Sequence, residues 1–169
     1  IYLNADSTRF INSGPLATEG HTAWTFDGLG NILTTGDLAI GTEFNGANVD
    51  SIEVRIWVSK SDFNTITPNN FQWGSSIDGA SAGSLYGYAI IKAPAGSLFG
   101  TGSTISVSGP PWGTYSKFPT TFYTSNYLAG GFAEFALDFT QLGLDPGING
   151  NACGMPYSRL LVKSRSSAS

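Results

Sequence analysis

Three carboxylates, Glu53, Glu134 and Asp138, lie in stretches where apolar and polar residues alternate, and each falls on the polar side. Two carboxylates across a concave sheet can hydrolyse a glycosidic bond, so this trio raises the hypothesis of a jelly-roll glycoside hydrolase. An ordinary solvent-facing sheet side predicts the same pattern. Both interpretations stay open, and no residue is assigned as catalytic.

Histidine and cysteine chemistry rests on single residues. His21 is the only histidine, which excludes multi-histidine metal sites and leaves one candidate base for a Ser or Cys nucleophile. A catalytic His21 would need an acid such as Asp27 and a nucleophile such as Ser84 or Cys153, but no motif indicates them. Cys153 is the only cysteine, so no intrachain disulfide forms, and it is either a small buried residue or an interchain link.

Aromatic residues in polar surroundings are the candidate binding groups. Flat rings can stack on sugars or anchor a protein partner, although they can equally plug the ends of a sandwich. The residues predicted to bind a glycan or a protein are Trp57, Trp73, Trp112 and Tyr115. Trp112 follows two prolines, which predicts a rigid loop tip.

Oxygen-rich turns raise the question of calcium. The segment Asp27-Gly28-Leu29-Gly30-Asn31 is one such turn, and Asp37, Asp78 and Asp145 mark others. Hard cations bind carboxylates and carbonyls, but no standard calcium-loop pattern is present. We therefore expect no cofactor, with a structural calcium ion as an alternative that the sequence does not indicate.

The elements that must position these residues are predicted to be strands. In residues 49–59, apolar residues alternate with polar ones at a period of two, and residues 132–140 repeat the pattern. The first stretch places Ile52, Val54, Ile56 and Val58 on one face and Ser51, Glu53, Arg55 and Trp57 on the other. Weaker strands are predicted at 9–12, 22–26, 32–35, 37–42, 86–93, 103–108, 120–124 and 159–164.

About ten short strands separated by turns predict an all-β fold, a two-sheet antiparallel β-sandwich of jelly-roll or Greek-key type. Asn45-Gly46 is expected to close a hairpin, and residues 140–145 are the only helix-like stretch. The least regular segments, 63–83 and 109–126, are the expected place for a binding surface.

Residues 1–169 are predicted to form a single β-sandwich domain. The last predicted strand is followed by a short serine-rich end, which suggests a fragment lacking its closing strand. An unpaired edge recruits strands from neighbours, so we expect the domain to exchange strands or to belong to a longer chain.

Composition narrows the class of partner. Charged residues make up 12% of the chain and the net charge is −4, with no basic stripe to neutralise a phosphate backbone. No apolar run approaches the length of about 20 residues that spans a membrane. We expect no nucleic-acid partner and no membrane insertion. A polar surface built from Ser, Thr, Asn and Gly is typical of exported proteins.

The C-terminal third contains Gly-Gly-Phe-Ala-Glu-Phe-Ala-Leu-Asp-Phe-Thr from Gly130, then Leu-Gly-Leu at 142–144, Cys153, and Leu-Val-Lys-Ser-Arg-Ser-Ser from Leu161. These stretches resemble repeat-like segments of bacterial secreted surface proteins, especially large ones of the Bacteroidota type. The resemblance implies a place outside the cytoplasm, attached to or shed from a bacterial surface. The resemblance assigns a catalytic role to no residue of this chain.

The function expected first is that of a non-enzymatic extracellular surface module with a structural or adhesive role, and one form of this role is that of a subunit in an extracellular filament or assembly. Its partner would be itself, through homo-oligomers or strand exchange, or surface glycans. A carbohydrate-binding module that uses loop aromatics is the alternative, and the glycoside hydrolase comes third.

Overall fold

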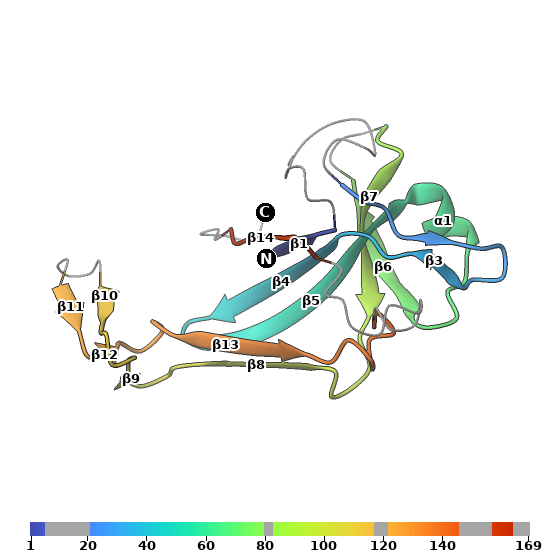
Figure 1. Ribbon diagram of the computed structural model, residues 1–169. Helices are drawn as coiled ribbons and strands as arrows, with labels where there is room; N and C mark the ends of the chain where they lie inside the picture. The colour runs from blue at the N-terminus through green and yellow to red at the C-terminus, as the bar shows by residue number, and fades with distance from the viewer. Residues whose placement is uncertain (6–20, 80–82, 117–121, 146–156, 164–169) are drawn as a thin grey trace. The chain divides into compact units, whose positions relative to one another are not determined.

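The structure is a computed structural model that describes residues 1–5, 21–79, 83–116, 122–145 and 157–163. Within these residues it contains strands β1 to β14 and one short helix, and the strand pairings are antiparallel (Figure 1). The predicted all-β, antiparallel fold class is confirmed. The chain divides into two compact units. The first comprises Ile1–Gly41, Glu53–Ser97 and Asp138–Ser169, and the second comprises Thr42–Ile52 and Leu98–Leu137.

The largest sheet has six strands in the order β14-β1-β4-β5-β7-β6. Their bounds are Arg159–Leu161 for β14, Tyr2–Asn4 for β1, Leu38–Asn45 for β4, Asn48–Ser59 for β5, Tyr86–Lys92 for β7 and Gln72–Asp78 for β6. Neighbouring strands β4 and β5 are joined by a two-residue connection at the predicted turn, where Gly46 has a φ of +64° that favours glycine. The predicted hairpin is confirmed.

The long strand β5 explains why this sheet forms. Its predicted apolar face is confirmed, because Val54, Ile56 and Val58 are all buried. The opposite face also buries one residue, Trp57, so the strand is covered on both sides near its end. Val58 forms an isolated parallel bridge with Trp24, which brings the segment before β2 against β5.

The first unit also contains a ribbon of β2 (Thr25–Phe26) with β3 (Ile32–Thr34), and helix α1 (Lys60–Thr65). Ser59 begins the helix, since its hydroxyl accepts a hydrogen bond from the Asp62 backbone N–H at 2.9 Å. The prediction that 140–145 is the only helix-like stretch was therefore wrong. Residues 139–143 form hydrogen-bonded turns.

The second unit contains three two-stranded pairs. They are β8 (Leu98–Gly102) with β13 (Ala133–Leu137), β9 (Val107–Ser108) with β12 (Asn126–Tyr127), and β10 (Thr114–Ser116) with β11 (Phe122–Thr124). A Cβ at Gly100 would lie 2.8 Å from side-chain atoms of Val49 and Ile52, so β8 approaches the start of β5 closely.

Every buried apolar residue of the described chain belongs to the first unit. The set is Trp24, Ile32, Leu38, Ala39, Ile40, Val54, Ile56, Trp57, Val58, Phe71, Ala89, Ile91, Leu142 and Leu144. Both units expose large apolar side chains, and those of the second unit include Phe44, Phe99, Ile105, Trp112 and Leu128. The two units therefore differ in how much burial stabilises them.

Some sequence predictions need correction. The segments expected to be irregular, 63–83 and 109–126, contain the unpredicted strands β6 and β10. Strands β1, β8 and β12 were not predicted either, whereas β11 falls within the strand predicted at 120–124. The predicted strand at 9–12 lies outside the described residues. No helix in the described part of the chain is long and apolar enough to cross a membrane.

Candidate binding site

His21 is part of a buried polar cluster around Asp37. The two Asp37 carboxylate oxygens accept hydrogen bonds from the Ala5 backbone N–H at 2.8 Å and the Asn4 amide at 2.9 Å, and His21 Nδ1 lies 3.0 Å from Oδ2. Asp37 is fully buried, and the Tyr88 hydroxyl lies 3.4 Å from the same histidine nitrogen. The cluster joins β1, β7 and the start of β4.

A catalytic His21 would have needed Asp27 as its acid and Ser84 or Cys153 as the nucleophile, but the hydrogen bonds of Asp27 and Ser84 are made to other groups. Asp27 accepts hydrogen bonds from the backbone N–H groups of Leu29 and Asn31, both at 2.9 Å, and so organises its own turn. The Ser84 hydroxyl donates to the Tyr86 carbonyl at 3.1 Å and accepts from Lys60. Cys153 lies outside the described residues. The geometry of His21 is that of a residue held in place by its neighbours.

The Asp27 turn also bears on the calcium hypothesis. Hydrogen bonds from the side chain and backbone of Asn31 lower the pKa of Asp27, and its oxygens already have N–H partners. Among the described residues, no group of three or more His, Cys, Asp or Glu side chains is placed to hold a metal ion.

Trp57, predicted to bind a ligand, is only 5% exposed. Its ring stacks on His21 at a centroid distance of 4.2 Å and lies edge-on to Tyr88 at 5.0 Å. Tyr86 lies parallel to it at 6.4 Å. These neighbours leave almost no ring surface for a soluble ligand.

Trp73 is half-buried and supports the segment before β6. Its indole N–H donates to the Ile66 carbonyl at 2.9 Å, and its ring contacts Phe63 and Phe71 at centroid distances of 5.3 and 5.0 Å. Phe71 and Trp73 are thereby fixed relative to each other.

The other two predicted aromatics belong to the second unit. Trp112 is 81% exposed, on a turn closed by a hydrogen bond from the Gly113 N–H to the Pro110 carbonyl at 2.9 Å. Tyr115 lies in β10, where its backbone pairs with Tyr123 of β11. The four predicted residues are thus divided between the two units.

The three carboxylates Glu53, Glu134 and Asp138 are also divided between the two units. Glu53 is in the first unit and forms an ion pair with Arg55 at 2.8 Å, whereas Glu134 is exposed on β13 of the second. Asp138 accepts hydrogen bonds from the backbone and side chain of Gln141, at 3.0 and 2.8 Å. The backbone bond is the main reason that the pKa of Asp138 is lowered, whereas a general acid needs a raised pKa.

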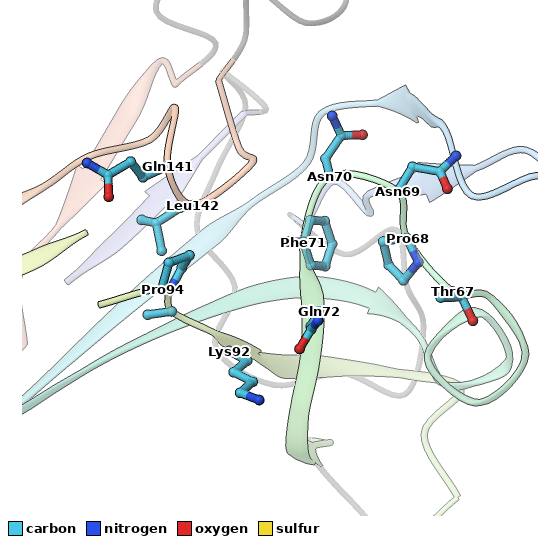
Figure 2. A pocket seen from close by; sticks show the side chains of 11 residues that line it. Thr67, Pro68, Asn69, Asn70, Phe71, Gln72, Lys92, Pro94, Gln141 and Leu142 are labelled. Atoms are coloured by element: carbon cyan, nitrogen blue, oxygen red, sulfur yellow. The ribbon is translucent and has the colours of Figure 1, made fainter. Parts of the chain in front are cut away.

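A hollow in the first unit is the strongest candidate site. It has a volume of about 510 Å³, within the range typical of small-molecule sites. It is lined by three segments, residues 67–72, 92–94 and 141–142, and we call it the amide pocket after its Asn and Gln side chains. Figure 2 shows Leu142 and Pro94 on one side of the hollow and Phe71 and Pro68 on the other.

The first wall of the amide pocket is fixed by the turn that follows β2. The Asn69 amide donates to the Leu29 carbonyl at 2.8 Å and to the Asn31 side-chain oxygen at 3.0 Å, and the Asn69 backbone N–H donates to the Gly30 carbonyl at 3.0 Å. Asp27 orders this turn. The wall is therefore formed before a ligand binds.

The opposite wall depends on Gly143. Its φ is +71°, and a Cβ at this position would overlap the Asn70 backbone carbonyl. Only glycine lets the turn that carries Gln141 and Leu142 come this close to residue 70.

The polar groups of the pocket combine fixed and free side chains. Gln141 is held by Asp138, and Asn69 is held by the turn before β3. The side chains of Asn70, Gln72 and Lys92 form no hydrogen bond or ion pair with other described residues. They are exposed, so they are free to bind a ligand.

Sequence reasoning did not select any pocket residue. The one signal was the Pro- and Asn-rich composition of 63–83, which contains the first wall but not the other two. Comparison with known families, curated proteins and solved structures found no match for this chain. The function is therefore inferred from the geometry of the chain itself.

Proposed function

We propose that this chain is a non-enzymatic extracellular surface module with an adhesive role, and that it adheres by binding glycans in the amide pocket. The observation that carries the proposal is a hollow of about 510 Å³ lined by Asn, Gln and ring side chains. An amide both donates and accepts hydrogen bonds, as each sugar hydroxyl requires. The exposed ring of Pro94 offers apolar surface to the C–H face of a sugar, and the buried rings of Pro68 and Phe71 support the walls around it.

Two further features support this proposal. The carboxylates that could have hydrolysed a glycan are paired with Arg55, bonded by Gln141 or placed in the other unit, which supports binding without catalysis. The low charge and the resemblance of the C-terminal third to bacterial secreted surface proteins support a place outside the cell.

Binding of the purified chain to a glycan array tests the proposal. The double variant Asn70→Ala with Gln72→Ala removes two free amides, and we expect it to lose most of the signal for every glycan that the wild type binds. Asn64→Ala, an exposed amide on α1 outside the pocket, is the matched control and should bind as the wild type does. A wild type that binds no glycan, or a double variant that binds equally well, would contradict the proposal.

Self-assembly through β14 is a second candidate. In the described part of the sheet, β14 is the end strand and pairs only with β1. Leu160 of β14 and Val162, directly after the strand, are 62% and 65% exposed. Such an edge can pair with a second copy of the chain.

Sedimentation velocity and negative-stain imaging at high protein concentration test this second candidate. We expect oligomers or filaments that the variant Val162→Lys reduces, because a buried ammonium disfavours the pairing. Monodisperse monomers at the highest concentration would rule it out and would leave the glycan proposal standing.

A further inference from the structure

The charge of the amide pocket is opposite to that of the chain. The chain carries a net charge of −4, yet Lys92 is the only charged residue that lines the pocket. The two carboxylates nearest to the lining residues along the chain are Asp138 and Asp145. Asp138 accepts hydrogen bonds from the backbone and side chain of Gln141, and Asp145 accepts one from the Thr140 hydroxyl at 3.0 Å. The pocket therefore presents one cation and no lining anion.

The strand register places that cation among the free amides. Gln72 of β6 lies directly opposite Lys92 of β7, so the two side chains leave the sheet on the same face. Figure 2 shows both side chains at the same end of the hollow. An anionic group that reached Lys92 would find the Gln72 amide beside it as a second donor.

Binding an anionic group at the Lys92 ammonium requires no other interaction to be broken. Its side chain is exposed and forms no ion pair with the described residues, so a ligand displaces no existing partner. An ammonium also gives little directional selection among anions. Charge, rather than the exact geometry of the anion, would decide which sugars bind.

We propose that the amide pocket selects acidic saccharides, and that Lys92 receives their anionic substituent while Asn70 and Gln72 bind their hydroxyls. This inference rests on the proposed glycan-binding function and adds the ligand class. The two can fail separately, because neutral sugars could bind without any preference for acidic ones.

Isothermal titration with matched oligosaccharides tests the inference. The probes are trigalacturonate, the same trisaccharide with its carboxylates reduced to alcohols, and a sulfated galactotriose as a second anion. At low ionic strength we expect about two- to fivefold tighter binding of an anionic probe than of the reduced trisaccharide, the size of an exposed ion pair. This preference should shrink at high salt.

Two lysine variants provide the control. Lys92→Gln should abolish the preference, so that the anionic probes bind no more tightly than the reduced trisaccharide does. The variant should still fold, because exposed charges contribute little to folding. Lys163→Gln makes the same charge change outside the pocket, after β14, and should keep the preference.

The outcomes separate the inference from the proposed function. Equal affinity for anionic and neutral probes, or a preference that survives Lys92→Gln, would overturn the selection of acidic saccharides alone. If no saccharide bound at all, including those of the array, both the inference and the glycan-binding function would be overturned.

Discussion

Asp37 is the residue on which the polar interior of the first unit depends. Its carboxylate accepts hydrogen bonds from Asn4 and Ala5 and faces His21, and its backbone carbonyl accepts one from the Trp24 indole at 3.0 Å. These partners come from β1, from the residue directly after it and from the segment before β2. One buried acid therefore joins distant parts of the sequence.

The variant Asp37→Asn tests this role. An amide cannot accept on both sides, so we expect the free energy of unfolding to fall by about 1–3 kcal/mol. Urea denaturation measures it. Asp27→Asn makes the same change in an exposed turn and should cost less. Equal losses in the two variants would show that Asp37 is not a central support.

Tyr88 should make the folded chain less stable at high pH. Burial is the main cause of its raised pKa, with the Asp37 charge adding to it. Because the folded state holds the phenol proton more tightly, unfolding releases that proton above about pH 10, the ordinary pKa of tyrosine. The stabilisation is fully present below this pH and is lost as the pH rises beyond it.

Thermal unfolding between pH 9 and 11.5 measures this effect. Tyr88→Phe should flatten the decline in melting temperature, whereas Tyr127→Phe, in the other unit, should follow the wild type. If the melting temperature of both variants declined with pH as steeply as that of the wild type, Tyr88 would ionise as readily in the folded chain as in the unfolded one.

The acid that pairs with His21 could not be predicted from the sequence. Its acid is 16 residues away, whereas the sequence suggested Asp27, six residues away. Nothing in local spacing reports that the chain returns to place Asp37 beside it. The burial of Trp57 was missed for a similar reason, because its covering rings come from His21 and from β7.

At the scale of elements, strong alternation made β5 and its hairpin with β4 predictable. β6 was missed because it contains Gly74 and four polar residues, and its register with β7 shifts between Trp73 and Ile77. Helix α1 left a signal that was overlooked, since Ser59 and Asp62 have the spacing of a helix N-terminus. The only sequence signal for the amide pocket was the composition of 63–83, because the three segments that line the pocket are far apart in sequence.

The close approach of the turn that carries Gln141 and Leu142 to Asn70 can be tested by substituting Gly143. Gly143→Ala should push the turn away from Asn70, lower stability by about 1–2 kcal/mol through its positive φ, and weaken glycan binding. Calorimetry and titration with a bound glycan measure both effects.

Gly28→Ala is the matched control, because a Cβ there would meet no atom within 4 Å and no positive φ is involved. It should change stability by less than about 0.5 kcal/mol. If Gly143→Ala bound glycans as well as this control does, the close approach of the turn to Asn70 would not shape the site.

At the scale of the whole molecule, the two units differ in their cores. The buried apolar residues of the described chain all belong to the first unit, and the second consists largely of two-stranded pairs. Two-stranded ribbons with little burial are only marginally stable. The second unit should therefore open more readily than the first.

Native-state hydrogen exchange tests this difference. Amides of β8 and β13 should exchange through openings of lower free energy than amides of β5 and β7 between residues 54 and 91. The same protection in both units would show that they unfold as one cooperative body.

The measurement that tests the central claim most directly is NMR titration of the labelled chain with an oligosaccharide selected on the array. The account predicts that the largest chemical-shift changes fall in residues 67–72, 92–94 and 141–142, around the amide pocket. Changes confined to residues 110–114 around the exposed Trp112, or no changes at saturating ligand, would contradict it.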